Sequence, residues 1–273
     1  MRYIVHETAE GRQVSVERDG TVLAGAPFSD DLSAFALSVQ AAEAGRAVPG
    51  PVTPGLALCS GARMICLGLN YVEHAKEGGH SKPDYPAFFL RVDTSLAPSG
   101  TIVPVPRVSD RLDYEAELLV MIGRGGRYIP EDEALGHVFA YGVFNDISLR
   151  DYQRKGGQWT PGKNFDLTGI LGAGFVTPDE VPAGASGLAI RSILNGQVMQ
   201  EANTSDMIFP VARAISLISD FMTLRPGDMI AMGTPSGVGY ARTPPVFMAE
   251  GDVISVEIEG IGVATATIGG RDA

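Results

Sequence analysis

Two glutamates, Glu115 and Glu117, lie where the sequence otherwise predicts a buried strand. The apolar run 118–122 follows directly, and side chains two residues apart in a strand point to the same face. Like charges on one face repel, and burying either without a partner costs several kcal/mol. Asp146, in the apolar stretch 141–147, is a plausible third acid beside them. Three carboxylates would suit a hard cation, Mg²⁺ or Mn²⁺, better than zinc. The alternative is a solvated strand face or pairing with arginines.

A second pair of polar residues, His74 and Glu77, follows an apolar strand that begins at Ile65. Residues three apart on a helical turn are neighbours. Glu77 would then fix the imidazole tautomer and raise its basicity, so that His74 could act as a general base that activates water. The alternative is a contact at the protein surface.

Composition narrows the class of protein. The chain has 273 residues, 45% of them hydrophobic, which is enough for one large core. A formal net charge of -11 argues against binding to nucleic acid or to an anionic membrane. No segment is apolar enough for a signal peptide or a spanning helix, so we expect a cytoplasmic protein. Cys59 and Cys66 have neither disulfide nor zinc spacing and are expected to be buried thiols.

The chain divides into two predicted domains, residues 1–60 and 61–273. In the first, a β element over 13–23 precedes a helix over 32–44, and a linker rich in Pro and Gly follows at 49–55. From residue 64 onward, short strand signals alternate with turns, which is typical of an all-β or β-rich core. Alternation over 252–259 predicts a half-buried antiparallel strand, and helical periodicity predicts one helix over 206–221. Two strand-forming regions with few helices indicate a β-rich α+β fold.

Taken together, several segments between residues 64 and 268 resemble the fumarylacetoacetate hydrolase family, in particular its bacterial acylpyruvate hydrolase and 2-hydroxyhepta-2,4-diene-1,7-dioate isomerase types. The order of the motifs carries the resemblance. They are Gly-Leu-Asn-Tyr-x-x-His-Ala-x-Glu at 68–77, Glu-x-Glu at 115–117, Asn-Asp at 145–146, Arg-Asp-Tyr-Gln at 150–153, Gly-Lys-Asn-Phe-Asp at 162–166, Asn-Gly at 195–196 and Gly-Thr-Pro-Ser-Gly-Val-Gly at 233–239.

This resemblance implies a mixed β-sandwich roll, usually in a homodimer, with one divalent ion per chain. It implies three groups of site residues: the metal ligands Glu115, Glu117 and Asp146; the catalytic residues His74, Glu77 and Lys163; and the substrate or oxyanion contacts Arg150, Gln153 and Thr234. Positive charge and an amide donor near developing negative charge agree with such roles. Each has a simpler explanation: Arg150 could pair with Asp151, Gln153 could be solvated, Lys163 could be a turn lysine, and Thr234 lies in a turn that needs no function.

The expected function is a divalent-metal-dependent hydrolase that cleaves a C–C bond in a β-diketo acid, such as an acylpyruvate, fumarylpyruvate or a 2,4-dioxo sugar acid. One alternative is a decarboxylase or keto–enol isomerase of a 2-oxo dicarboxylate in aromatic catabolism. A second alternative, from another class, is a non-catalytic metal-stabilised binding protein. A binding protein would need the acids but not His74 beside Glu77, so we favour an enzyme.

The substrate itself is not predicted. After residues 162–166 the chain continues Leu-Thr-Gly-Ile-Leu-Gly, where many members of the family have a Gly-Pro segment. The polar loop 78–86 is either a lid over the metal or an ordinary surface loop. Trp159 and the segment 240–242 are candidates for substrate contacts, although Trp159 would also suit the core.

Overall fold

The computed structural model describes residues 1–18, 21–28 and 52–272. At its centre lie two antiparallel strands, β10 (Ala116–Ile122) and β11 (Val138–Asp146). Every residue of β10 is buried, because its apolar side chains are covered on both faces of the sheet. These two strands therefore place Glu117 and Asp146, and Glu115 directly before β10, in the interior of the protein.

Among the described residues, the larger sheet contains eleven strands in the order β3-β2-β1-β13-β11-β10-β16-β5-β6, with β4 paired to β1 and β7 to β13. Pairing is parallel between β16 and β5 and between β13 and β7, and antiparallel elsewhere. The remaining strand bounds are β1 (Arg2–Thr8), β2 (Gly11–Arg18), β3 (Thr21–Pro27), β4 (Thr53–Pro54), β5 (Met64–Gly68), β6 (Ala87–Arg91), β7 (Leu96–Pro98), β13 (Gly169–Val176) and β16 (Met229–Ala231).

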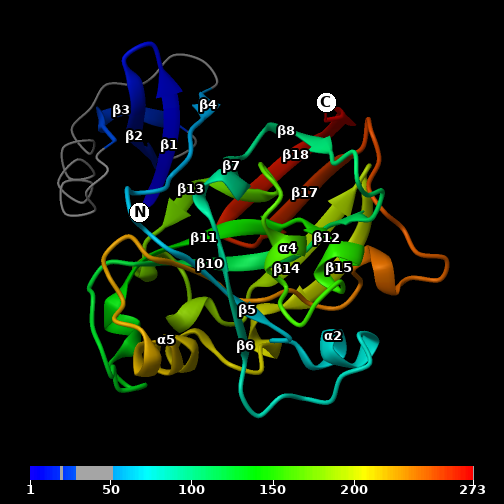
Figure 1. Ribbon diagram of the computed structural model, residues 1–273. Helices are drawn as coiled ribbons and strands as arrows, with labels where there is room; N and C mark the ends of the chain where they lie inside the picture. Colours follow the sequence, from blue (N-terminus) through cyan, green and yellow to red (C-terminus); the bar gives the residue numbers. More distant parts are fainter. Residues whose placement is uncertain (19–20, 29–51, 273) are drawn as a thin grey trace.

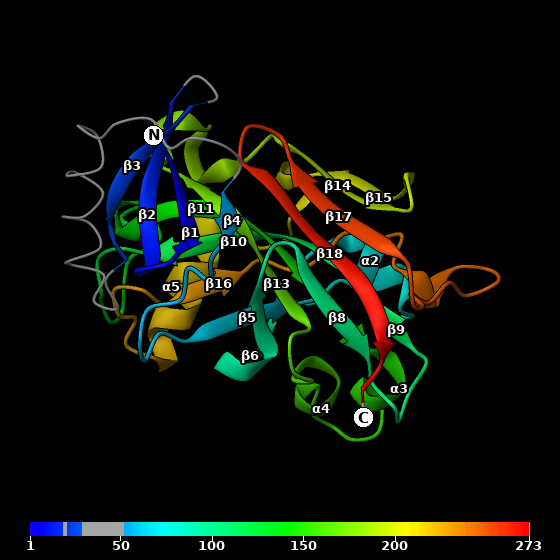
Figure 2. The same cartoon turned by 90° about the horizontal axis from the view of Figure 1, so that it is seen from above.

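A second sheet contains five strands in the order β15-β14-β17-β18-β8 within the described chain. Its strands are β15 (Gln197–Asn203), β14 (Ala189–Leu194), β17 (Val253–Ile258), β18 (Gly262–Arg271) and β8 (Thr101–Val105). This sheet lies beside β10, β11 and β13 in both views (Figure 1 and Figure 2). A short pair, β9 (Leu112–Asp113) with β12 (Ser148–Leu149), lies next to the acids. The predicted β-rich α+β class with a mixed β-sandwich roll is confirmed, and β17 has the expected alternation of buried residues.

The α-helices described are α2 (Val72–Glu77), α3 (Arg150–Gln153), α4 (Thr160–Lys163) and α5 (Val211–Phe221). Short 3₁₀ helices are η1 (Asp93–Ser95), η2 (Ala134–His137), η3 (Pro178–Glu180), η4 (Ala183–Ala185), η5 (Thr204–Asp206) and η6 (Gly239–Ala241). The prediction that one helix covers 206–221 is wrong at its start. Pro210 is the N-cap of α5, because proline disfavours helical backbone in the residue before it. Met207 instead forms a β-bridge with Tyr71.

The predicted β element over 13–23 forms most of β2 and the beginning of β3, and β1 joins this hairpin to β13 of the larger sheet. Buried apolar side chains of β1 and β2 pack in one cluster with those of β10, β13 and β16. The helix predicted over 32–44 lies outside the described residues, and the domain boundary at residue 60 stays a prediction.

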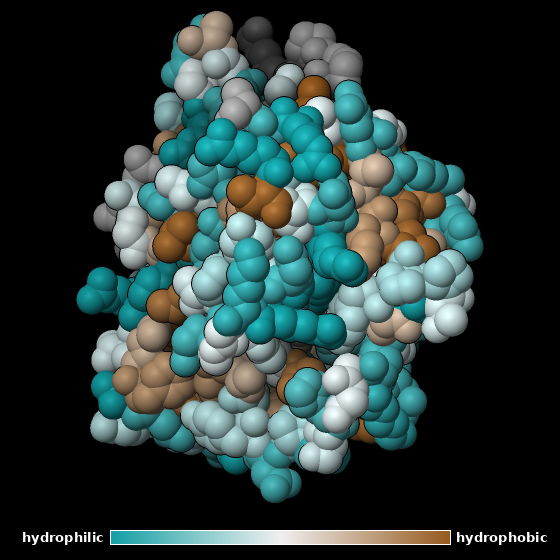
Figure 3. Space-filling model, turned by 45° about the vertical axis from the view of Figure 1, so that its right-hand side comes forward, coloured by the Kyte–Doolittle hydropathy of each residue, from teal (hydrophilic) through white to brown (hydrophobic). Residues whose placement is uncertain are grey.

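Both cysteines are buried free thiols, as predicted. None of the helices in the described part of the chain has the length and apolarity needed to cross a bilayer. Hydrophilic residues cover most of the face drawn in Figure 3, where hydrophobic residues form small separate groups. This agrees with the excess of acidic residues in the composition.

Candidate metal centre and catalytic site

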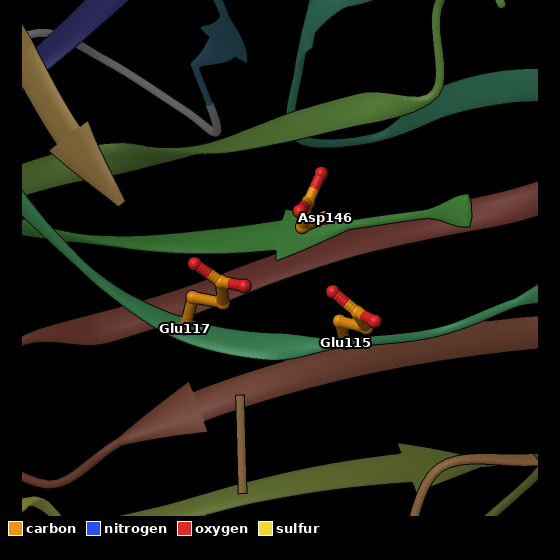
Figure 4. A group of neighbouring side chains, drawn as sticks. All are labelled: Glu115, Glu117 and Asp146. Atoms are coloured by element: carbon orange, nitrogen blue, oxygen red, sulfur yellow. The ribbon is translucent and has the colours of Figure 1, made fainter. Parts of the chain in front are cut away.

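Glu115, Glu117 and Asp146 lie together, as the sequence predicted. The pairing of Ala116 with Asn145 brings the start of β10 beside the end of β11. One carboxylate oxygen from each acid lies within 4.8 Å of the other two, and all three residues are buried. Figure 4 shows the three carboxylate groups on the same side of these neighbouring strands. The alternative of a solvated strand face is therefore wrong, whereas pairing with arginines occurs for Glu115 and Asp146. The role of the acids as metal ligands stays a prediction.

Three buried cations surround these acids. Lys163 Nζ lies 2.6 Å from Glu115 Oε2 and 2.6 Å from Asp146 Oδ2. Arg150 donates from Nη1 to Glu115 Oε1 at 2.5 Å, and from Nε to Asp113 Oδ2 at 2.7 Å. Asp146 Oδ1 accepts a hydrogen bond from Arg91 Nε at 2.5 Å. The simpler explanations for Arg150 and Lys163, a surface pair and a turn lysine, do not hold, because both side chains are buried in this cluster.

The acids differ in how their charge is balanced. Burial alone would raise the pKa of Glu115, yet the charges of Lys163 and Arg150 lower it to about 2. Burial and the nearby charges of Asp146 and Glu115 raise the pKa of Glu117 well above its ordinary value. Among the described residues, Glu117 has no ion pair and accepts a hydrogen bond from the backbone N–H of Gly233 at 2.8 Å.

This imbalance is the observation that fits a divalent cation. An additional positive charge between the three acids would favour the ionised form of Glu117. Carboxylate oxygens are also the ligands that Mg²⁺ and Mn²⁺ prefer. The donor set is therefore suited to such an ion.

The predicted contact between His74 and Glu77, here called the dyad, is present, and its catalytic role stays a prediction. Helix α2 places His74 Nδ1 2.8 Å from Glu77 Oε1, and the second oxygen of Glu77 accepts a hydrogen bond from the backbone N–H of Gly237 at 3.0 Å. His74 is buried. Because both carboxylate oxygens of Glu77 are bound, the imidazole is held in one orientation.

Most of the predicted site residues line one pocket. It is lined by His74, Glu115, Glu117, Lys163 and Thr234, together with Leu67, Gly68, Leu69, Phe89 and Trp159. Thr234 is buried, and its hydroxyl accepts a hydrogen bond from Gln200 Nε2 at 2.7 Å. Gln153 does not line this pocket, and its Oε1 accepts a hydrogen bond from Arg150 Nη1 at 3.0 Å. Gln153 would therefore act by positioning Arg150, whereas Thr234 faces the space where a substrate would bind.

Three polar residues of this region were missed by sequence reasoning. Arg91 ends an apolar strand, and its guanidinium also reaches Thr168 Oγ1 at 3.1 Å. Asp113 is buried, and its Oδ1 accepts a hydrogen bond from the backbone N–H of Gly239 at 2.7 Å. Gln200 Oε1 accepts from the N–H of Ala116 at 3.0 Å. The available signal was Asp113 itself, a third acid beside the Glu-x-Glu pair.

The family profile described as "Fumarylacetoacetate (FAA) hydrolase C-terminal" matches residues 63–269. The chain belongs to the fumarylacetoacetate hydrolase family. It is therefore related to enzymes that include hydrolases, isomerases and tautomerases. The resemblance drawn from the order of the motifs between residues 64 and 268 is confirmed at the level of the family.

Individual members of the fumarylacetoacetate hydrolase family differ in activity. The mitochondrial oxaloacetate tautomerase FAHD2A of Bos taurus is 41% identical over 203 residues, which are 74% of this chain and 64% of the bovine protein. A 5-carboxymethyl-2-hydroxymuconate delta-isomerase from Mycobacterium smegmatis is 30% identical, with a TM-score of 0.82 and 100% of both chains covered. Fumarylpyruvate hydrolase from Pseudomonas aeruginosa, in complex with Mn²⁺ and pyruvate, is 29% identical, with a TM-score of 0.70 over 81% of this chain and 98% of the other.

Proposed function

We propose that this protein interconverts the keto and enol forms of a small 2-oxo dicarboxylate, such as oxaloacetate, in a site that binds Mg²⁺ or Mn²⁺. The observation that carries the proposal is that His74, held by Glu77, lines the same pocket as Glu115 and Glu117. The 41% identity to an oxaloacetate tautomerase supports this reaction over hydrolysis, which is represented by a relative at 29%.

A cation held by Glu115, Glu117 and Asp146 would bind oxygens of the 2-oxo acid and withdraw electrons from its carbonyl. The remaining steps belong to the side chains. With Nδ1 of His74 hydrogen-bonded to Glu77, Nε2 is the nitrogen that takes a proton from the carbon beside the carbonyl. The proton is then returned to the enolate oxygen, which completes the tautomerisation.

Two further residues would stabilise the substrate. The ammonium group of Lys163 lies among the acids and adds positive charge near the developing enolate. The hydroxyl group of Thr234 lines the same pocket and would bind a substrate carboxylate. These contacts would fix the 2-oxo acid with its reactive carbon toward His74.

The test is the rate at which oxaloacetate enol is converted to the keto form, followed by ultraviolet absorbance with Mg²⁺, with Mn²⁺ and with EDTA. We expect conversion well above the spontaneous rate with either metal, and only the spontaneous rate with EDTA. His74→Gln is the matched control, because it keeps the acids but removes the base. Conversion at the spontaneous rate in every condition would contradict the proposal.

Hydrolysis of a β-diketo acid is the second candidate, and the intact His74–Glu77 dyad favours it, since a dyad can activate water. Here His74 would take a proton from water, and the hydroxide would attack the distal carbonyl. The C–C bond would then break to give a carboxylic acid and a pyruvate enolate. NMR of separate incubations distinguishes the candidates: release of pyruvate from acetylpyruvate or fumarylpyruvate indicates hydrolysis, and conversion of oxaloacetate to pyruvate and CO₂ indicates decarboxylation.

The assembly and location are part of the same proposal. We retain one divalent ion per chain, a homodimer and a cytoplasmic location from the sequence analysis. Light scattering during size-exclusion chromatography tests the dimer, because a monomer at working concentration would contradict it.

A further inference from the structure

The free space beside the metal ligands is small. The cavity lined by His74, Glu115 and Glu117 has a volume of about 30 Å³, and since about 10–15 Å³ of such volume holds one water molecule, it has room for roughly two. A 2-oxo dicarboxylate is several times larger than a water molecule. A side chain that lines the pocket must therefore move before a substrate can bind.

Trp159 is the largest side chain in this lining. Its indole lies directly over Gly68, the last residue of β5: a Cβ atom placed on Gly68 would come within 1.9 Å of Cζ3 and 2.4 Å of Cη2. The ring also contacts Phe89 edge to face, with centroids 5.7 Å apart. Trp159 is only partly buried, so it lies at the boundary between the pocket and solvent.

The residues directly before Trp159 in the chain are exposed to solvent, whereas Gly162 and Lys163, which follow it, are buried. Gly156 and Gly157 are exposed, and a Cβ atom on either would have no neighbour within 4 Å. Glycine allows a wide range of backbone conformations. On the other side, Gly162 donates its N–H to Trp159 O at 2.9 Å, and a Cβ atom on Gly162 would lie 2.4 Å from the backbone of Gln153. The indole can therefore move while Lys163, one residue after Gly162, keeps its place in helix α4.

We infer that Trp159 determines the size of substrate that this site accepts: its indole covers the pocket on Gly68, shifts outward when a 2-oxo acid binds, and in the shifted position still borders the pocket and limits the length of the substituent beyond the oxo group. This inference rests on the proposed function and deepens it. It predicts a preference for short 2-oxo acids over longer ones.

Fluorescence tests the movement directly, because Trp159 is the single tryptophan of the chain. The probe is oxalate, added with Mg²⁺ or with EDTA, and its binding is measured in parallel by calorimetry. We expect a saturable red shift of the emission and stronger quenching by acrylamide, both dependent on Mg²⁺. Oxalate binding without a change in emission would overturn the inference alone. The absence of any Mg²⁺-dependent oxalate binding would overturn the proposed function as well.

Gly68→Ala tests the contact without a ligand. The added methyl group cannot coexist with the indole at its present position, so the variant should show the red-shifted emission in the absence of oxalate. An emission spectrum identical to that of the unmodified protein would contradict the placement of Trp159 on Gly68.

Specificity is tested with pairs of long and short substrates: a 2-hydroxymuconate-type dienoate with oxaloacetate, and fumarylpyruvate with acetylpyruvate. For whichever pair is turned over, Trp159→Leu should raise the ratio of kcat/KM for the long over the short substrate at least about tenfold, as expected for a change of pocket size. Trp159→Phe should raise it less. Phe88→Leu is the matched control, because Phe88 packs on the opposite side of β6, against Phe221. An unchanged ratio in Trp159→Leu would overturn the inference.

Discussion

Asp228 and Glu117 are both acids buried in the larger sheet, at neighbouring strands β16 and β10, but their surroundings differ. Asp228, directly before β16, accepts hydrogen bonds from the N–H and the guanidinium of Arg63 and from the N–H of Arg225 at 2.7 Å. Glu117 shares its space with two other acids and, among the described residues, accepts one backbone N–H and forms no ion pair. The charge of Asp228 is therefore balanced by the guanidinium of Arg63, whereas Glu117 has no ion-pair partner among the described residues.

This difference distinguishes an acid that stabilises the fold from an acid that is suited to bind a cation. A buried carboxylate that stabilises a fold needs donors for its oxygens and one compensating charge, and Asp228 has both. Keeping three carboxylates within 4.8 Å of one another costs stability unless a further cation is bound. We therefore expect substitutions at Glu117 to reduce activity and substitutions at the Arg63–Asp228 pair to reduce stability.

Glu117→Gln should have the largest effect on activity. Losing one ligand would remove part of the stabilisation that a metal provides, about 4 kcal/mol, and each 1.36 kcal/mol is tenfold in rate, so kcat/KM should fall roughly a thousandfold. Without metal, the variant should be as stable as the unmodified protein or more stable, since a buried acid is replaced by a neutral amide. Steady-state kinetics with Mg²⁺ and urea unfolding in EDTA measure the two effects. A large loss of stability in EDTA would show that Glu117 is a structural acid like Asp228.

His74→Gln should have the next largest effect. General acid–base catalysis typically contributes about 10²–10⁴-fold, so kcat should fall by roughly a hundredfold to a thousandfold. Metal affinity should stay the same, because His74 is hydrogen-bonded to Glu77 and does not belong to the acid cluster. Calorimetry with Mg²⁺ provides this control. Unchanged kcat with normal metal binding would exclude His74 as the base.

Glu77→Gln should have a smaller effect, because Gln can still accept the hydrogen bond from His74 Nδ1 but lacks the charge that stabilises the imidazolium. Hydrogen bonds to charged groups contribute about 1.5–3 kcal/mol, so kcat should fall roughly tenfold to a hundredfold. Glu77→Asp should retain more activity only if the shorter side chain still reaches the imidazole. A loss as large as that of His74→Gln would mean that Glu77 is needed for more than orientation.

How much of the site could be predicted depended on how far apart in the sequence the interacting residues lie. The Glu-x-Glu pair and the i, i+3 spacing of His74 and Glu77 are local patterns, because strand and helix periods place these side chains on one face. The position of Asp146 beside them depends on the pairing of β10 with β11. Its place in an apolar, strand-like stretch made it a candidate for the third acid, and the family resemblance implied the same role. Arg91 could not be predicted, since it lies 55 residues from Asp146 and on β6, which does not pair with β11, so only the folded chain brings the two side chains together.

The fold was predictable to a similar degree. Alternation gave β17 correctly, and turn signals gave the β-rich class. The start of α5 was misplaced, because apolar spacing continued through 206–210 although Pro210 prevents the helix from extending back. The addition of β1 to β13 had no local signal, since an edge strand can pair with any sheet whose edge is free.

Arg63→Met should have the smallest effect on activity and a measurable effect on stability. Removing one partner of a buried pair costs about 3–5 kcal/mol, but the N–H groups of Arg63 and Arg225 would still bind Asp228, and the Arg63 side chain is 26% exposed. A loss of about 1–3 kcal/mol is therefore expected, the cost of one missing hydrogen-bond partner for a buried acid. Urea unfolding in EDTA measures it, with Arg63→Lys as the matched control that keeps the charge.

The activity per folded molecule should be unchanged in Arg63→Met, because within the described chain the Asp228 carboxylate is bound by Arg63 and Arg225, forms no hydrogen bond or ion pair with the three acids or His74, and lies outside the pocket lining. A fall in kcat/KM without a fall in stability would mean that the Arg63–Asp228 pair is coupled to the site through β16 and its neighbour β10. The contrast between Glu117 and Asp228 would then be one of degree, with both acids acting on the same strands.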